Sequence, residues 1–173
     1  NQTKVATIAI AEHNGPVYLR FGRPKVPVFT SSTEPFRIGK AWHIHSGNHV
    51  SIFCTGHLVW KSIEAARVLE AEGITVDLIN LHTIKPLDEA AIIASAKKTG
   101  AVVTAEEHQI NGGMGSLVAQ VLARHCPTPM TFVGVNDSFG ESGTPDQLMK
   151  KYGLEADDVV RAARALISSK AGK

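Results

Sequence analysis

Cysteine, aromatic residues and excess charge are all scarce in this sequence of 173 residues. The two cysteines, Cys54 and Cys126, form no CxxC pair, which excludes a disulfide scaffold and favours a reduced, cytoplasmic protein. A net charge of +2 gives no electrostatic reason to expect nucleic acid or a membrane as a partner. No apolar run is long enough to span a bilayer. What remains, with 43% hydrophobic residues, is the composition of an ordinary globular domain.

The first 35 residues do not have the pattern of a domain of their own. Residues 3–12 carry apolar side chains at helical spacing, and residues 17–21 form a predicted strand with no neighbouring strand in the sequence. Residues 30–35 have the composition of a linker. We therefore expect residues 1–35 to be the tail of one domain with its linker, and residues 36–173 to be a complete second domain.

The second part alternates between apolar strands and helices. Strands are predicted at 36–45, 50–55, 75–80, 101–105 and 130–135, and helices at 56–73, 86–98, 112–125, 146–152 and 156–167. Repeated crossovers of this kind require a parallel sheet with helices on both faces. The turn Ser46-Gly47-Asn48 is too short for such a crossover, so the first strand should form a hairpin, antiparallel to its successor. The predicted fold is α/β, with three layers (α/β/α) around a mixed, mostly parallel five-stranded sheet whose first strand is antiparallel.

Two motifs follow the strand at 101–105. Glu106-Glu107-His108 lies where open α/β sheets collect ligands, and a carboxylate beside an imidazole can transfer protons, but no nucleophile accompanies them. The alternative is a strand end that meets solvent or a neighbouring subunit. Gly112-Gly113-Met114-Gly115 opens a helix, where free amides attract anions. It lacks the dinucleotide fingerprint and the P-loop lysine, so we favour a tight turn and close helix packing.

Histidines and arginines supply the other candidates. His43 and His45 should share one strand face, and His49 could approach across the turn, as in a metal site. Zinc sites usually have cysteine or another firm ligand, so a solvated edge strand is favoured and no metal site is predicted. Arg20 and Arg23 are the stronger signal, since a guanidinium matches the fork of a phosphate. A surface salt bridge is the alternative for these two arginines.

Seven segments together resemble the transketolase family. They are GPVYLRFGRP at 15–24, IGKA at 38–41, CTGHLVWKSIEAA at 54–66, NLHTIKPLD at 80–88, VTAEEH at 103–108, GGMGS at 112–116 and GTPDQLMKKYGL at 143–154. The resemblance implies an enzyme of three domains, of which the first holds the diphosphate of thiamine diphosphate and the second, the pyrimidine domain, activates that cofactor. Residues 1–35 would be the end of the pyrimidine domain with its linker. Residues 36–173 would be the third, C-terminal domain.

The function implied by this resemblance is transfer of a two-carbon ketol unit between sugar phosphates. Thiamine diphosphate and Mg²⁺ would serve the full enzyme, and this portion alone would bind neither and supply no catalytic residue. Arg23 matches the family arginine that binds the phosphate of the sugar. Glu106, Glu107 and His108 would be interface residues, and the glycines after them turn residues.

The resemblance also implies partners. These are the remaining transketolase domains or a separate N-terminal subunit, within a homodimer whose active site lies at the subunit interface. The sequence GRPKVP at 22–27 favours the split transketolases, whose C-terminal half is a separate polypeptide. Alternatives that share this domain are 1-deoxy-D-xylulose 5-phosphate synthase and the beta subunits of 2-oxo acid dehydrogenases. A non-catalytic module that binds an anion or nucleotide, or that only dimerises, is the alternative outside the family.

Overall fold

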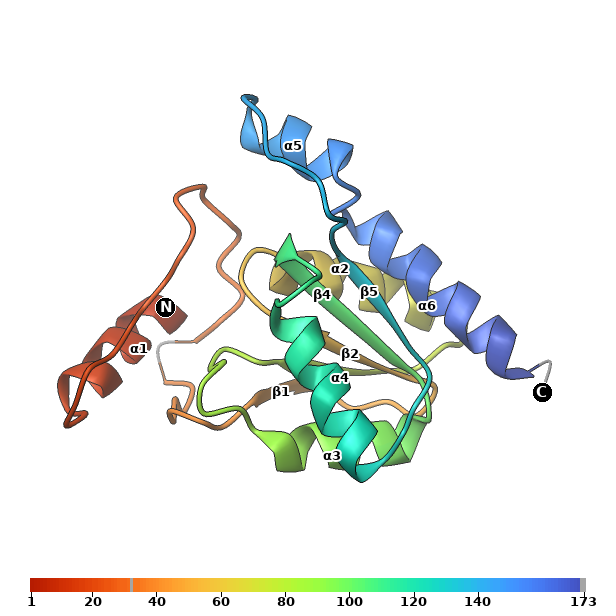
Figure 1. Cartoon of the computed structure of the whole chain (residues 1–173), viewed down its shortest axis with the longest axis horizontal. Helices are drawn as coiled ribbons and strands as arrows, with labels where there is room; N and C mark the ends of the chain where they lie inside the picture. The colour runs from red at the N-terminus through yellow and green to blue at the C-terminus, as the bar shows by residue number, and fades with distance from the viewer. Residues whose placement is uncertain (32, 172–173) are drawn as a thin grey trace.

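A computed structural model describes residues 1–31 and 33–171 of the chain. Its elements, in chain order, are α1 (Gln2–Ala11), β1 (Trp42–His45), β2 (Val50–Cys54), α2 (Leu58–Ala71), β3 (Val76–Asn80), α3 (Glu89–Thr99), β4 (Val102–Gln109), α4 (Met114–His125), β5 (Met130–Val135), α5 (Pro145–Lys151) and α6 (Ala156–Ala171). The strands form one sheet in the order β1-β3-β2-β4-β5. Helices α2 and α6 cover one face of the sheet and α3 and α4 cover the other (Figure 1). The predicted three-layer α/β/α fold is confirmed.

Side-chain alternation along the buried strands builds two cores. Val103 and Ala105 of β4 lie in the core under α2 and α6, whereas Val102 lies in the core under α3 and α4. β2 and β3 are buried along their whole length because helices cover both of their faces. All neighbouring strands are parallel except β1, which runs antiparallel to β3.

The sequence predicted an antiparallel hairpin between the first two strands. The antiparallel direction of the first strand is confirmed, but the predicted pairing of the two strands with each other is wrong. β1 is antiparallel, but it pairs with β3, which lies between β1 and β2. The short connection must therefore pass over the start of β3, and Gly47 makes that passage possible. A Cβ on Gly47 would lie 2.5 Å from the carbonyl carbons of both Thr75 and Val76, a separation that no side chain tolerates.

Three predicted strands differ from the structure by more than one residue at an end. The strand expected at 36–45 shortens to β1, because only its end meets β3. Residues 17–21 are extended but form no strand-to-strand hydrogen bonds, since no strand of the described chain pairs with them. The strand expected at 101–105 continues to Gln109 because its charged residues find buried partners, as described below.

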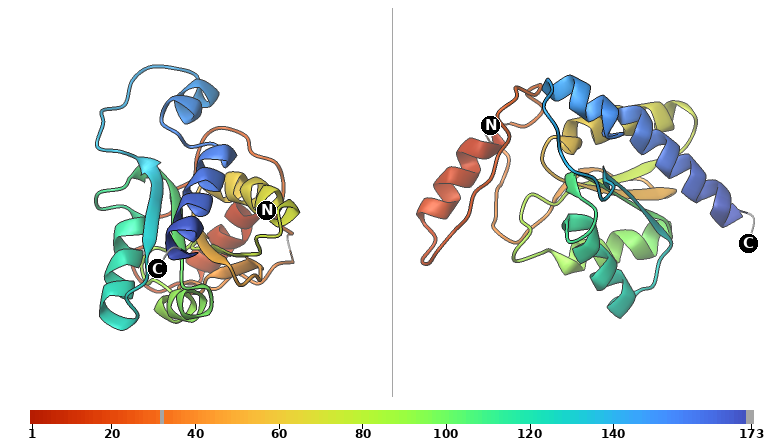
Figure 2. Two further views of the ribbon diagram at one scale, coloured as in Figure 1. Left: turned by 90° about the vertical axis from the view of Figure 1, so that its right-hand side faces the viewer. Right: turned by 45° about the horizontal axis from the view of Figure 1, so that its top comes forward.

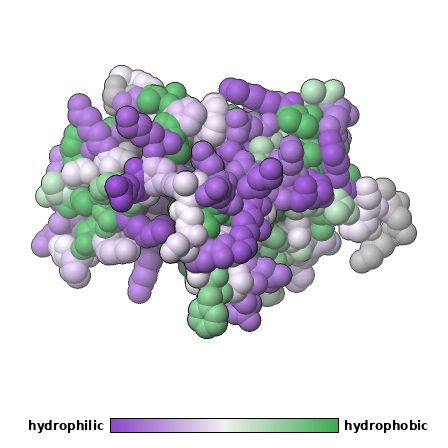
Figure 3. All heavy atoms as spheres, turned by 90° about the horizontal axis from the view of Figure 1, so that it is seen from above, coloured by the Kyte–Doolittle hydropathy of each residue, from purple (hydrophilic) through white to green (hydrophobic). Residues whose placement is uncertain are grey.

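Residues 1–31, here called the N-terminal arm, stand apart from the sheet (Figures 1 and 2). Phe29 fixes the end of the arm by stacking on Trp42 and Trp60, with ring centroids 6.4 Å and 5.9 Å apart. Elsewhere the arm exposes apolar side chains, and Tyr18 is 86% exposed. Viewed from above, apolar groups stand among polar ones on the side where the arm lies (Figure 3). No helix among residues 1–31 and 33–171 is both long and apolar enough to cross a membrane.

The Gly47 crossing gives a test of the sheet topology. We expect Gly47→Ala to lower the free energy of unfolding by about 3 kcal/mol, because the added methyl meets backbone that cannot rotate away. Gly140→Ala is the matched control: a Cβ there has no neighbour within 4 Å, and we expect a change within about 0.5 kcal/mol. Chemical denaturation of both variants measures the difference. Equal stability of the two variants would contradict the crossing.

Candidate functional site

The carboxyl ends of β2, β3 and β4 face the N-terminal arm across a groove of about 1300 Å³. In open α/β sheets this is the edge where ligands bind. Its polar lining includes His57 after β2, Asn80 and His82 at the end of β3, and Glu106 and Glu107 on β4. Glu106 and Glu107 lie at this edge of the sheet, as the sequence predicted. The structure also shows which groups each carboxylate binds.

Glu106 is only 1% exposed, and its carboxylate occupies the N-terminus of α4. The backbone amides of Met114 and Gly115 donate to it at 2.7 Å and 2.8 Å, and His108 Nδ1 lies 3.3 Å away. Burial alone would raise the pKa of this carboxyl. The hydrogen bonds from His108 and from the two amides outweigh burial, so the pKa of Glu106 lies below its usual value.

The glycine motif therefore packs a helix and does not hold an external anion. The amides that an anion would need already bind Glu106. A Cβ on Gly113 would lie 2.5 Å from the Glu106 carboxylate, and one on Gly115 would lie 2.6 Å from Thr104 Oγ1. Both glycines thus allow α4 to approach β4 closely, which is the interpretation that the sequence favoured.

Glu107 does the same for α2 on the opposite face of the sheet. Its Oε2 accepts a hydrogen bond from the backbone amide of His57, the residue before α2, at 2.9 Å. Gly56 lies against the carboxylate and has no Cβ to obstruct it. Successive residues of a strand point to opposite faces, so the adjacent pair on β4 serves two helices in two layers. Negative charge is favourable at both helix N-termini.

Arg20 connects the N-terminal arm to this edge. Its Nη1 lies 3.3 Å from Glu107 Oε1 and also contacts His108 Nε2. A neutral His108 with its proton on Nδ1 donates to Glu106 and leaves Nε2 free to accept from the guanidinium. The surface salt bridge considered for the two arginines is thus present at Arg20. Arg23 is exposed, and no hydrogen bond or ion pair joins it to another residue of 1–31 or 33–171.

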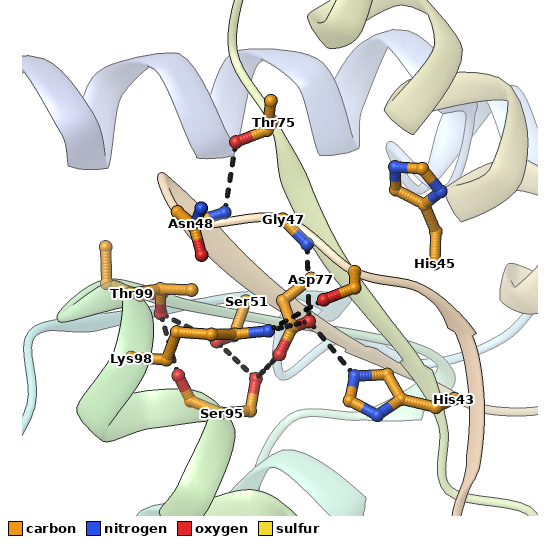
Figure 4. A network of polar contacts seen from close by, with 12 residues as sticks. His43, His45, Gly47, Asn48, Ser51, Thr75, Asp77, Ser95, Lys98 and Thr99 are labelled. Carbon is orange, nitrogen blue, oxygen red and sulfur yellow. Dashed lines mark hydrogen bonds and ion pairs between the residues drawn. The ribbon is translucent and has the colours of Figure 1, made fainter.

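The histidines of β1 do not converge on one point (Figure 4). His43 Nε2 lies 3.0 Å from Asp77 Oδ1, whereas His45 Nε2 lies 2.6 Å from Glu70 on α2. A register irregularity between His43 and His45 breaks the alternation that would have put them on one face. His49 instead binds Thr75. Across the described parts of the chain, no three His, Cys, Asp or Glu side chains are grouped as a metal site requires.

Asp77 is the centre of a second polar cluster, at the opposite edge of the sheet (Figure 4). It is fully buried, and Lys98 Nζ and Ser95 Oγ each lie 2.5 Å from it. Burial would raise the pKa of Asp77, but its bonds to Lys98, Ser95 and His43 lower it below the usual value. The cluster satisfies a buried charge, and its position at the amino ends of the strands separates it from the groove.

Three other titratable side chains near this edge have structural roles. His82 stacks on Phe36 with ring centroids 4.3 Å apart, and burial lowers its pKa, so it is neutral near pH 7. The His57 imidazole lies against Gly22 of the arm. Burial raises the pKa of Cys54 to about 12, which leaves that thiol unreactive.

The groove does not suit the diphosphate of a thiamine cofactor. A diphosphate with its cation needs free helix amides or cationic side chains with carboxylate or amide ligands for the metal. Here the N-termini of α2 and α4 carry the chain's own carboxylates, Glu107 and Glu106, which would repel a diphosphate. The N-termini of α2 and α4 therefore offer no site for that group.

Comparison with known proteins decides the family. The sequence model described as the transketolase C-terminal domain matches residues 39–159. The chain belongs to the transketolase family. Enzymes of this family are of the transferase type and generally use thiamine diphosphate.

Relatives cover the N-terminal arm as well. The 6-deoxy-6-sulfo-D-fructose transketolase subunit SqwH of Clostridium sp. is 43% identical over 98% of this chain, and a putative transketolase C-terminal section of Methanocaldococcus jannaschii is 36% identical over 92%. This chain spans 52% and 50% of those proteins. A 1-deoxy-D-xylulose-5-phosphate synthase of Caldanaerobacter subterraneus is 36% identical over 83% of the chain, which spans 24% of it.

A solved structure has the same fold over almost the whole chain. It is a split-gene transketolase, described as an inactive beta4 tetramer, with a TM-score of 0.92 and 46% sequence identity. The match covers 96% of this chain and 55% of that one. Since the chain spans only about half of such relatives, the family to which it belongs includes further domains or subunits.

Sequence reasoning missed two features of the edge. The helix-capping role of Glu106 and Glu107 had a signal, because two acidic residues at a strand end were followed by a glycine-rich helix start. The contact of Arg20 with Glu107 had none, since 87 residues separate them.

Because two backbone amides donate to the ionised carboxylate of Glu106, we predict that the stability of the protein depends on pH through this residue. Glu106→Gln should lower the free energy of unfolding by about 2–3 kcal/mol at pH 7, because the two backbone amides donate to different oxygens and one of these becomes an NH2 group, which cannot accept. A carboxyl whose folded pKa is lowered stabilises the protein above its unfolded pKa, and this stabilisation is lost as pH falls through the folded pKa. The difference between wild type and variant should therefore shrink below about pH 4.

Denaturation curves between pH 3 and pH 7 measure this difference. The exposed Glu141 is the control, because Glu141→Gln changes a surface contact with Lys151 and should shift stability by at most about 0.5 kcal/mol. A difference for Glu106→Gln that stays constant across this range would contradict the role of the ionised carboxylate.

Proposed function

We propose that this chain is the C-terminal part of a transketolase, which acts with the remaining domains or with a separate N-terminal subunit. The proposed reaction is transfer of a two-carbon ketol unit between sugar phosphates. The observation that supports it most is the 43% identity, over 98% of the chain, to a protein named as a transketolase subunit. Relatives named as subunits and as a C-terminal section favour the split arrangement.

The N-terminal arm supports a division of the chain at about residue 35. Residues 1–35 would be the tail of the pyrimidine domain with its linker, and residues 36–173 the C-terminal domain. The apolar side chains of Val17, Phe21 and Val28 are 44%, 67% and 79% exposed. Such a group of exposed apolar side chains is typical of a surface that another domain or subunit covers. The extended segment at 17–21 has backbone amides and carbonyls without a strand partner in the described part of this chain. A sheet of the pyrimidine domain would supply their hydrogen bonds.

Arg23 is the residue we propose for binding the substrate phosphate. It follows the extended segment in a loop between Gly22 and Pro24, and those two neighbours line the groove. Its guanidinium is exposed and free to form the paired hydrogen bonds that a phosphate accepts. Binding the phosphate end of the sugar would orient the reacting end toward the cofactor.

The cofactor and the dimer belong to the complete assembly. Thiamine diphosphate would supply the carbanion-stabilising chemistry of the reaction, and in this proposal residues outside the chain would hold it together with Mg²⁺. The carboxylates that occupy the N-termini of α2 and α4 support this assignment of the cofactor to residues outside the chain. A homodimer of the assembly, located in the cytoplasm, completes the proposal.

Reconstitution tests the function. This chain and the N-terminal half of the same transketolase, with thiamine diphosphate and Mg²⁺, should consume a ketose phosphate only when an aldose acceptor is present. Product analysis by mass spectrometry follows the two-carbon transfer. Turnover that requires pyruvate as donor would indicate a 1-deoxy-D-xylulose-5-phosphate synthase instead. Turnover by this chain alone would contradict the proposal.

Arg23 gives a prediction for substrate binding. In the reconstituted enzyme, Arg23→Ala should raise KM for a phosphorylated sugar about 10–100-fold, because a charge-assisted hydrogen-bond pair is lost. Lys25→Ala is the control, since it removes a nearby exposed cation from the same arm and should leave KM unchanged. Steady-state kinetics with sugars ending in phosphate, sulfonate or hydroxyl measure the effect. An unchanged KM for every anionic sugar would remove this assignment.

A further inference from the structure

We propose that Glu107 of the C-terminal domain is a positioning residue for substrate binding, acting through Arg20 on the loop that carries Arg23. The inference rests on the proposed function and extends it to a residue that touches neither substrate nor cofactor. It means that the C-terminal domain affects the KM for the sugar phosphate in addition to its role in assembly.

Two contacts hold the arm immediately before Arg23. Arg20 Nη1 lies 3.3 Å from Glu107 Oε1, and Gly22 packs so closely on the His57 imidazole that a methyl group there would overlap the ring. Both partners belong to the carboxyl edge of the sheet. The loop that carries Arg23 thus starts from a fixed point on the C-terminal domain.

The other end of the loop is fixed as well. Phe29 stacks between Trp42 of β1 and Trp60 of α2. Between these anchors lie Pro24 and Pro27, whose rings restrict the backbone. A short loop with two anchored ends and two prolines has few conformations, so Arg23 loses little freedom when it binds an anion.

Glu107 is better suited to hold Arg20 than an ordinary surface carboxylate. Its side chain is 12% exposed, and its second oxygen is already fixed by the His57 amide. His108 Nε2 offers the same guanidinium a second acceptor, and Glu106 orients that imidazole through Nδ1. Two acceptors on rigid backbone therefore define the position of an arginine whose own side chain is half exposed.

A purely structural role for Glu107 would be to cap α2, and one substitution separates the two roles. In Glu107→Gln an amide oxygen can still accept from the His57 backbone, so the cap remains. The negative charge that holds Arg20 is lost. The variant should therefore fold normally and release the arm.

Kinetics of the reconstituted enzyme are the first measurement. Glu107→Gln should raise KM for a phosphorylated sugar about tenfold and change kcat less than twofold, since the reacting groups are untouched. Arg20→Gln should do the same. The double variant should match Arg20→Gln, because Arg20→Gln already removes the contact with Glu107 together with the contact with His108. Multiplying effects, or an unchanged KM in both single variants, would overturn the proposal.

Limited proteolysis of this chain alone is the second measurement and needs no partner or substrate. Glu107→Gln should speed tryptic cleavage after Arg20 at least severalfold, because the segment is no longer held against the sheet edge, and should leave amide exchange in α2 unchanged. Glu72→Gln is the matched control, because Glu72 pairs with Arg164 from a distant segment and should alter neither region. Unchanged cleavage after Arg20 would overturn the tether. A wild-type assembly without turnover would contradict the proposed function, and proteolysis would still decide the tether.

Discussion

Two adjacent carboxylates at the end of β4 are the constraint on which the rest of the carboxyl edge depends. Glu106 and Glu107 point to opposite faces of the sheet, and each accepts backbone amides at the start of a helix. Because one strand end satisfies both α4 and α2, the two helical layers are fixed in register with each other. The strand can also extend past its apolar part, since its charges are satisfied inside the protein.

The same constraint decides the chemistry of the groove. Free amides at helix starts would have made this edge a site for anions, as in many α/β proteins. With those amides bound to carboxylates, the edge is acidic, and it attracts a guanidinium from the arm instead. On the arm side of the groove, positive charge comes from Arg20, and Arg23 follows it between two groove-lining residues; both arginines precede the domain in sequence. The phosphate site of the proposed enzyme would thus combine two parts of the chain. Arg23 of the arm would bind the phosphate, and Glu107 of the C-terminal domain would hold the arm in place through Arg20.

The sequence predicted the parts of this structure that depend on local pattern. Alternating apolar strands and helices gave the five-stranded sheet, its layers and the direction of β1, and β5 has the predicted bounds. It could not give pairings that depend on non-local contact. β1 lies beside β3 because Gly47 lets the chain cross, and His43 and His45 separate because of a register irregularity. The motif at Gly113 was understood as packing, but its occupant Glu106 became visible only in three dimensions.

In the proposed enzyme the C-terminal domain would influence substrate binding without approaching the reacting atoms, and the geometry of the arm explains how. Between Gly22 and Phe29 the arm is exposed and leaves the body, while both of its ends rest on the domain. Any change that moves α2 moves His57 and Trp60 together, and hence both ends of the loop. An arginine must meet a phosphate within a few tenths of an ångström to form paired hydrogen bonds, so in the proposed enzyme the rigidity of the sheet edge would contribute directly to substrate affinity.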